Sequence, residues 1–189
     1  TELNNKGTAR LTLSPGGGAM EFDVSWTGWS SFDVLALDFG KETSFIVDIG
    51  GGSLEVILSA GGMIEETHSL PLGAVRLTEN YVRTDPVASS EWKDLRKAID
   101  RVLKKRLGKP PFVTPVMIGS GGTFSAIASI AMFERQGELG PGQGYRLPRS
   151  ECQQLARRLR DAPLEVRRKI RGLNPGRADI IVAGAAAVD

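Results

Sequence analysis

The sequence predicts an α/β fold in which a mixed sheet, built on an antiparallel meander, is covered by helices. Three short apolar segments separated by glycine turns occupy residues 45–70, which is typical of a β-meander. A stretch with amphipathic helical spacing at Glu91–Leu107 precedes a fourth apolar segment at Phe112–Ile118. Helical patterns then continue from residue 150 to residue 188. This order of segments indicates one sheet with helices packed on it.

The individual elements follow from these patterns and from their end signals. Ser89 or Ser90 is the expected N-cap of the long amphipathic helix, and Thr123 that of a later apolar helix. The expected elements are strands at Phe45–Ile49, Leu54–Ser59 and Met63–Leu70, helices at Ala74–Val82 and Glu91–Leu107, a strand at Phe112–Ile118, a helix from Thr123 to about Arg135, and helices at Ser150–Asp161, Pro163–Arg171 and Pro175–Val188.

The sequence divides into two segments. Residues 1–44 have no clean hydrophobic period, and the turn signal at Ser14–Gly18 interrupts them. We interpret them as an uncertain N-terminal segment or linker, and residues 45–189 as the folded domain.

The composition is that of an ordinary folded protein. Of its 189 residues, 41% are hydrophobic and 24% are charged, which excludes disordered, collagen-like and coiled-coil classes. The longest uncharged apolar stretches, such as Ile180–Val188, are far shorter than the roughly 20 residues that span a bilayer. No basic and then apolar leader opens the chain. We therefore expect a soluble, cytoplasmic protein with no membrane partner.

Cysteine and histidine chemistry is nearly ruled out by number. The sequence has one cysteine, Cys152, and one histidine, His68. These counts exclude a disulfide framework within the chain and a cysteine-rich zinc site, and they disfavour a Ser-His hydrolase. We expect structural roles for both residues.

Charge is segregated along the chain. Residues 1–72 carry a net charge of −7 and residues 73–189 a net charge of +9. A positive field of this kind attracts polyanions, which include phosphate compounds, acidic partners and, less favoured here, nucleic acid. The long helix has a basic face formed by Lys93, Lys97, Arg101 and Lys104. We favour a solvated surface for this face, and the alternative is that it guides a polyphosphate chain. For the arginine-rich stretch at residues 157–171, polyanion contact and solvated surface remain equal alternatives.

The first glycine turn, Gly50-Gly51-Gly52-Ser53, lies between two predicted strands. Glycine tolerates positive φ and has no Cβ, so backbone N–H groups in such a turn can point into one concavity and bind an anion such as phosphate. When the turn is considered alone, a plain hairpin loop is the favoured explanation.

Two acids flank that turn. With a four-residue loop, Ile49 pairs with Leu54 and Asp48 pairs with Glu55, which places two carboxylates opposite each other on one face. Facing like charges are unfavourable unless a cation or a shared proton lies between them. We therefore predict a hydrated Mg²⁺ that bridges Asp48 and Glu55 to a phosphate. A register slip of one residue would separate the two acids.

The second glycine turn, from Gly119 to Thr123, ends a strand and opens a helix, whose N-terminus favours anions. It has neither the Lys-Ser/Thr of a P-loop nor the spacing of a dinucleotide fingerprint. Close packing between helix and strand is an equal alternative reason for its glycines. Arg177 and Asp179 precede the last predicted helix, and we expect them to fix its N-terminus.

Four segments in this order resemble the exopolyphosphatase and guanosine pentaphosphate phosphatase family: Asp48 to Glu55, Ser69 to Thr78, Gly119 to Thr123, and Arg177 to Ala185. The resemblance covers about residues 45–189. It implies the actin-like, ribonuclease-H-like fold, two such domains facing across a cleft, and Mg²⁺-dependent hydrolysis of terminal phosphoanhydride bonds. Polyphosphate, guanosine pentaphosphate or another phosphoanhydride would be the substrate.

The resemblance also implies roles for particular residues. Asp48 and Glu55 would be catalytic residues and metal ligands. The phosphate-binding residues would be Gly50, Gly51, Gly52 and Ser53, and the nucleotide motif would be Gly119, Gly121, Gly122 and Thr123.

One part of the family pattern is not found. The family's catalytic base is a glutamate about twenty residues before the Asp48 loop, but Val24–Ser30 contains no carboxylate. Leu37–Gly40 resembles the first phosphate loop yet lies too close to Asp48 to belong to a separate domain. The chain thus resembles the second, C-terminal half of the family's core. A fragment, one subunit of a split protein and an inactive homologue all fit.

The expected partners are therefore the missing N-terminal domain, a partner subunit or a second copy of the chain. The alternative function is a non-catalytic module that binds a nucleotide or polyphosphate, or pairs with a partner domain.

Overall fold

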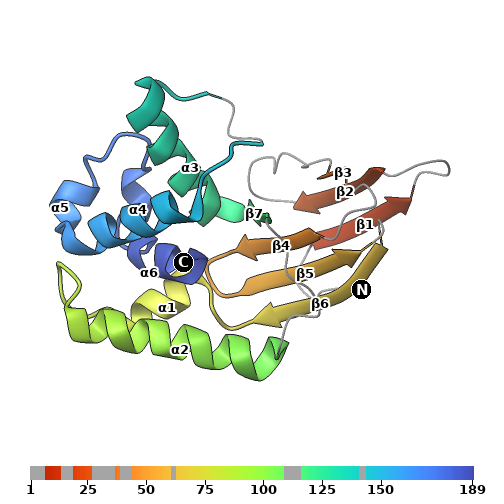
Figure 1. The fold of residues 1–189 in the computed structure, drawn as a ribbon, viewed down its shortest axis with the longest axis horizontal. Helices are drawn as coiled ribbons and strands as arrows, with labels where there is room; N and C mark the ends of the chain where they lie inside the picture. Colours follow the sequence, from red (N-terminus) through yellow and green to blue (C-terminus); the bar gives the residue numbers. More distant parts are fainter. Residues whose placement is uncertain are drawn as a thin grey trace.

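A four-stranded mixed sheet with the order β6-β5-β4-β7 is the centre of the fold (Figure 1). The computed structural model describes residues 7–13, 19–26, 37–38, 44–60, 63–108, 116–140 and 144–189. Antiparallel pairing joins β4 to β5 and β5 to β6, whereas β4 and β7 are parallel. The strands are β4 (Ser44–Ile49), β5 (Leu54–Ala60), β6 (Met63–Leu70) and β7 (Met117–Ser120). The predicted meander and mixed sheet are confirmed.

The two faces of the sheet differ in what covers them, because side chains alternate along each strand. One face joins the main core with Val47, Ile49, Leu54, Val56 and Leu58. The other carries a small apolar cluster of Ile46, Ile57, Ile64 and Ile118. Asp48 and Glu55 each lie two residues from a member of this second cluster, so both belong to the face away from the main core.

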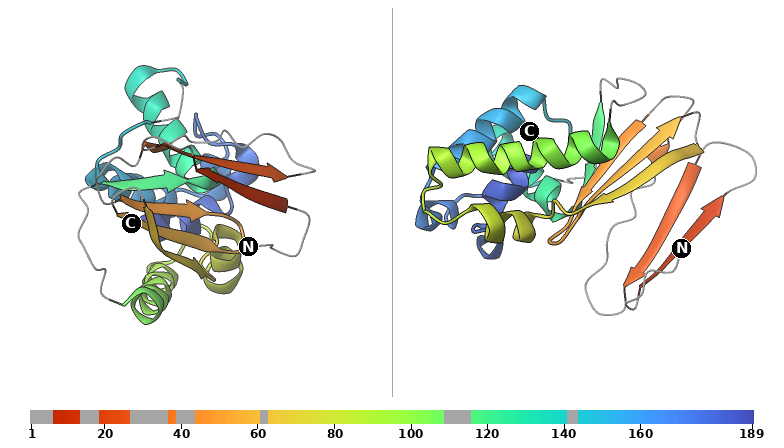
Figure 2. Two further views of the ribbon diagram at one scale, coloured as in Figure 1. Left: turned by 90° about the vertical axis from the view of Figure 1, so that its right-hand side faces the viewer. Right: turned by 90° about the horizontal axis from the view of Figure 1, so that it is seen from below.

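Helices gather at the end of the sheet that bears the β4–β5 turn (Figure 1). α2 also runs beside β6 (Figure 2). The helices are α1 (Ala74–Tyr81), α2 (Ser89–Leu107), α3 (Gly121–Gln136), α4 (Arg149–Asp161), α5 (Leu164–Arg167), the 3₁₀ helix η1 (Pro175–Arg177) and α6 (Ile181–Val188). Within the described residues, no helix combines the length and the apolar composition needed to cross a bilayer.

α6 is the buried hub of the helical layer. Residues 181–186 are all buried, and α6 contacts α1, α2, α3 and α4. Its alanines and Gly184 leave little side chain between neighbouring backbones, and a Cβ on Gly184 would lie only 2.8 Å from the hydroxyl oxygen of Thr123. This small-residue helix therefore determines how closely the other helices approach one another.

Several predicted helix ends were wrong. The N-cap of α2 is Ala88 rather than Ser89 or Ser90. Glu91 accepts hydrogen bonds from the amide and hydroxyl of Thr84, and the Thr84 hydroxyl accepts one from the amide of Ala88. α3 begins at Gly121, so Thr123 lies inside the helix and does not cap it. The predicted helix at 163–171 shortens to Leu164–Arg167, and that at 175–188 divides into η1 and α6.

The fourth strand ends later than predicted, because Gly119 and Ser120 of the predicted glycine turn belong to it. β7 covers Met117–Ser120, and residues 112–115 of the predicted strand lie outside the described residues.

Three strands occur where the sequence predicted no element. β1 (Gly7–Leu13), β2 (Ala19–Trp26) and β3 (Leu37–Asp38) form an antiparallel sheet in that order. Three predictions for this region fall wholly or partly outside the described residues. They are the turn at Ser14–Gly18, residues 27–30 of the window without a carboxylate, and residues 39–40 of the segment that resembles the first phosphate loop. The division at residue 44 into an N-terminal segment and a domain stays a prediction.

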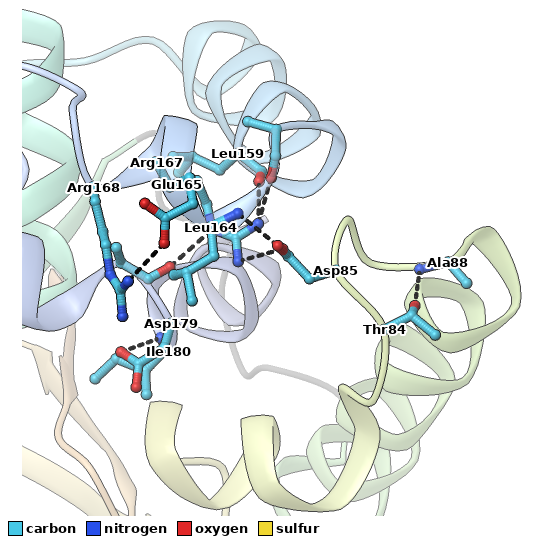
Figure 3. A network of polar contacts seen from close by, with 12 residues as sticks. Thr84, Asp85, Ala88, Leu159, Leu164, Glu165, Arg167, Arg168, Asp179 and Ile180 are labelled. Atoms are coloured by element: carbon cyan, nitrogen blue, oxygen red, sulfur yellow. Dashed lines mark hydrogen bonds and ion pairs between the residues drawn. The ribbon is translucent and has the colours of Figure 1, made fainter.

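A buried arginine ties the helices together (Figure 3). Arg167 is only 3% exposed. Its Nε donates to the carbonyl of Ala178 over 2.8 Å, Nη1 donates to the carbonyls of Leu159 and Ala162, and Nη2 lies 3.0 Å from Asp85 Oδ1. Asp85 Oδ2 also accepts from the amide of Leu164 over 2.7 Å. This network joins the loop after α1 to the segment that carries Arg177.

Candidate functional site

The two acids face each other as predicted. Asp48 on β4 is in register with Glu55 on β5, immediately beside the glycine turn. Burial raises the pKa of Asp48 above its ordinary value, a hydrogen bond with the Ser120 side chain opposes this shift, and the charge of Glu55 adds to it. Asp48 is therefore a partly desolvated carboxyl group that faces a second one.

Glu55 is oriented by two serines. The hydroxyls of Ser53 and Ser69 both donate to Glu55 Oε1, over 2.5 and 3.2 Å. Ser69 lies opposite Glu55 in the β5–β6 register, so this contact could have been predicted from the strand pairing of the meander. Sequence reasoning did not identify Ser69 or Ser120 as site residues.

The first glycine turn is held against the N-terminus of α1. Gly50 N–H donates to the Ser53 carbonyl over 3.0 Å and closes the turn. The Gly50 carbonyl accepts from Ala74 N–H over 2.9 Å. The Gly51 carbonyl accepts from the amides of residues 75 and 76, and the Gly52 carbonyl accepts from the side chain of residue 76. Three successive carbonyls of the turn therefore point toward α1.

The amides of the same peptides point the other way. In a trans peptide the C=O and the following N–H lie on opposite sides of the bond. The N–H groups of Gly51, Gly52 and Ser53 therefore face away from α1. None of the three donates a hydrogen bond to any described residue. Three free amides on one side of a turn can bind an anion.

Of the two predicted reasons for glycine in this turn, positive φ does not apply and the missing Cβ remains. Gly50, Gly51 and Gly52 are not among the described glycines with positive φ. A Cβ on Gly52 would have no neighbour within 4 Å, and one on Gly51 would lie 3.3 Å from Val75. Because the fold does not require a glycine at position 52, the missing side chain leaves the turn open.

The second glycine turn packs directly on Asp48. Gly121 has a φ of +84°, and a Cβ there would lie 2.6 Å from Asp48 Oδ1 and 2.8 Å from the Ile49 carbonyl oxygen. A Cβ on Gly119 would overlap the ring of Phe124. Close packing thus explains these two glycines. The same packing brings the two turns, distant in sequence, into one site.

Arg177, the last residue of η1, also lies at the site. The sequence did not predict this role for Arg177. Its guanidinium lies so close to Gly122 that a Cβ there would overlap it. Its Nε is buried without a hydrogen-bond partner, and the guanidinium pairs with no carboxylate among the described residues. It does not cap α6, whereas Asp179 does accept a hydrogen bond from the amide of Ile180 over 2.9 Å. Arg177 is therefore an unpaired cation beside the second turn.

Thr123, which was predicted as part of the nucleotide motif, is buried, and its role as a site residue stays a prediction. It is 1% exposed and packs against Gly184. No group of three or more metal-ligating side chains occurs among the described residues. Asp48 and Glu55 are the pair that could hold a divalent cation.

The sheet order, the helices around it and the paired glycine turns define a domain of the actin-like ATPase fold. More closely, the chain belongs to the Ppx/GppA phosphatase family, whose model matches residues 33–189. An exopolyphosphatase 2 from Mycobacterium tuberculosis is 28% identical over 173 residues, which make up 91% of this chain and 53% of that protein. The chain thus spans about half the length of the curated relatives it matches.

Solved structures agree with this assignment. A Ppx/GppA family member from Aquifex aeolicus superposes with a TM-score of 0.68 at 30% identity, covering 77% of this chain and 46% of that one. An exopolyphosphatase from Cytophaga hutchinsonii superposes with the same TM-score, 0.68, at 24% identity over 78% of this chain and 48% of that one, and it supports the fold.

Proposed function

We propose that this domain is the phosphate-binding half of an exopolyphosphatase-type phosphoanhydride hydrolase. The observation that carries the proposal is the β4–β5 turn, where three unbound amides face one side next to the paired acids Asp48 and Glu55. Family membership and the name of the mycobacterial relative support the reaction class. Polyphosphate and guanosine pentaphosphate are the proposed substrates.

The proposed role of the turn is to hold the terminal phosphoryl group. The amides of Gly51, Gly52 and Ser53 would donate to its oxygens, and Arg177 would supply positive charge from the second turn. Fixed backbone donors stabilise the charge that develops on phosphoryl oxygens without having to reorient during the reaction. The absence of a carboxylate partner for Arg177 among the described residues supports its availability to a phosphate.

Asp48 and Glu55 are the proposed ligands of a hydrated Mg²⁺. Two carboxylates fit this ion because Mg²⁺ usually keeps several waters and completes its shell with substrate phosphates. When bound, the ion would neutralise negative charge on the phosphoanhydride. Burial, and to a smaller extent the charge of Glu55, raises the pKa of Asp48, and a cation bound between the two carboxylates would favour the ionised form of Asp48.

We assign proton transfer to a residue of the other half of the family's core and not to this domain. The described carboxylates beside the turn, Asp48 and Glu55, are assigned to the metal. A general base typically contributes about 10²- to 10⁴-fold to a rate. We therefore expect this chain to bind its substrate and, alone, to hydrolyse it slowly or not at all.

Binding of tripolyphosphate, measured by calorimetry with and without Mg²⁺, tests the proposal. The wild-type chain should bind in the presence of Mg²⁺, and Asp48→Ala should weaken binding by tenfold or more, about 1.4 kcal/mol. Glu138→Ala, which removes an exposed acid just after α3, is the matched control and should bind like wild type. Absence of Mg²⁺-dependent binding by the wild-type chain would overturn the proposal.

A further inference from the structure

Arg76, the third residue of α1, holds the phosphate turn twice. Its backbone N–H donates to the Gly51 carbonyl over 3.1 Å, and its side-chain Nε donates to the Gly52 carbonyl over 2.9 Å. The side chain is exposed and forms no ion pair with a described residue. Its hydrogen bond to the turn is therefore the polar contact that fixes it.

The three carbonyls of the turn differ in how securely they are held. Those of Gly50 and Gly51 accept from backbone amides of α1, which no side-chain substitution removes. The Gly52 carbonyl accepts from the Arg76 side chain instead. The peptide between Gly52 and Ser53, which carries the Ser53 amide, is therefore bound to α1 through a side chain and not through a backbone amide.

The approach of α1 makes this contact possible. A Cβ on Gly73 would overlap the backbone of Gly51 and Gly52, so the helix starts in direct contact with the turn. A shallow hollow of about 470 Å³ lies on this side, and Arg76 lines it together with Gly51, Gly52, Val75, Glu79 and Asn80. Arg76 thus lies behind the turn, on the side opposite to the free amides.

A cation bound to a carbonyl also changes the amide of the same peptide. Hydrogen bonds in a chain polarise one another, so donation to the Gly52 carbonyl strengthens the Ser53 N–H as a donor. The charged guanidinium makes the stronger kind of hydrogen bond.

We propose that Arg76 is a positioning residue of the phosphate site, which orients and polarises the Gly52–Ser53 peptide so that the Ser53 amide donates to the bound anion. The inference rests on the proposed function and extends it. Arg76 acts from behind the turn and does not touch the phosphate.

Binding of tripolyphosphate with Mg²⁺ to Arg76→Met and Arg76→Lys tests this role. We expect affinity to fall by five- to tenfold for Arg76→Met and by a smaller factor for Arg76→Lys, whose ammonium can donate to the carbonyl without the fixed planar geometry of Arg. Arg83→Met is the matched control, because it removes an exposed arginine just after α1 that does not bind the turn. It should bind like wild type.

Salt dependence separates positioning from simple charge attraction. Salt screens exposed charges, so an effect of Arg76→Met that acts only through long-range attraction would vanish at high salt. We expect the ratio of wild-type to variant affinity to persist. Two results would overturn the inference while the proposed function stands. One is equal affinity of Arg76→Met and wild type for tripolyphosphate. The other is wild-type affinity of Arg76→Lys, together with an affinity ratio between wild type and Arg76→Met that disappears at high salt.

The amide NMR spectrum of the free protein gives a second readout that needs no ligand. Arg76→Met should shift the Ser53 amide resonance upfield and leave that of Gly51, whose peptide is held by Ala74, nearly unchanged. An unshifted Ser53 amide contradicts the inference. If wild-type protein fails to bind tripolyphosphate, the proposed function fails, and this spectrum still tests whether Arg76 orients the peptide.

Discussion

Asp48 occupies a position that is unfavourable for its own charge. It is partly buried, it faces Glu55 across the β4–β5 pair, and the backbone at Gly121 packs against its carboxylate. Ser120 provides partial compensation through its side-chain hydrogen bond. An ionised carboxylate kept in such surroundings is characteristic of sites where stability is given up for binding.

Removing that charge should stabilise the free protein. Because the pKa of Asp48 is raised on folding, its ionised form opposes folding, and this loss of stability develops as pH rises from the unfolded value through the raised folded one. We expect Asp48→Asn to raise the midpoint of thermal unfolding at neutral pH, without Mg²⁺ or phosphate, and also to weaken Mg²⁺-dependent binding. An unchanged or lower midpoint would contradict this account of Asp48.

The same shift predicts how binding depends on pH. A cation binds the ionised form of Asp48. Burial, and to a smaller extent repulsion from Glu55, raises the pKa of Asp48, so its protonated form persists to higher pH than in an ordinary aspartate. Titration of Mg²⁺-dependent tripolyphosphate binding should therefore show a loss on acidification that begins above the ordinary aspartate range. In Asp48→Asn this step should be absent, and a step that persists would assign it to another group.

Among the elements, α5 and the loop after α1 depend on each other through Arg167. Its guanidinium donates to the carbonyls of Ala178 and Ala162 and pairs with Asp85, so one buried cation joins three separate segments of the chain. Ala178 directly follows Arg177, which lies at the second glycine turn. This network therefore fixes the segment that brings Arg177 to the site.

Replacing Arg167 should be costly. Arg167→Met leaves buried carbonyls without donors, at about 1–3 kcal/mol for each unsatisfied group, and we expect a total loss of about 3 kcal/mol or more in the free energy of unfolding. Arg168→Met is the matched control. It removes only an exposed pair with Glu165 and should change stability by about 0.5 kcal/mol or less. Denaturant unfolding of both variants checks this, and equal stabilities would show that the network contributes little.

For the whole molecule, the main consequence is that the chain matches about half of its relatives' length. The proposed phosphate and metal groups lie on the described domain, whereas the resemblance to the family implies a glutamate base in the other half. We expect phosphate release from polyphosphate to appear when the preceding domain of a family member, with its glutamate-rich loop, is added or fused to this chain.

The measurement is Mg²⁺-dependent phosphate release by the combined halves, with Asp48→Ala in this chain as the control that should abolish it. Hydrolysis by this chain alone at the rate of the combined protein would show that its own residues supply the base.

Sequence alone determined the parts of the fold that depend on local patterns. Alternating apolar residues and glycine turns identified β4, β5 and β6, and the loop length fixed the register that pairs Asp48 with Glu55. Family resemblance then gave the fold and the family. Helix ends were less predictable, because residues such as Thr84 and Glu91 bind each other across the sequence and shift the start of α2.

Only the tertiary structure decided which groups meet at the turn. Arg76 binds the Gly52 carbonyl from 24 positions away, and Arg177 reaches Gly122 from the other end of α4 and α5. No local pattern encodes these contacts, since they depend on how closely α1 and α6 pack, which in turn depends on small residues such as Gly73 and Gly184. The sequence established the chemistry available at the turn, and packing between distant segments determined its orientation.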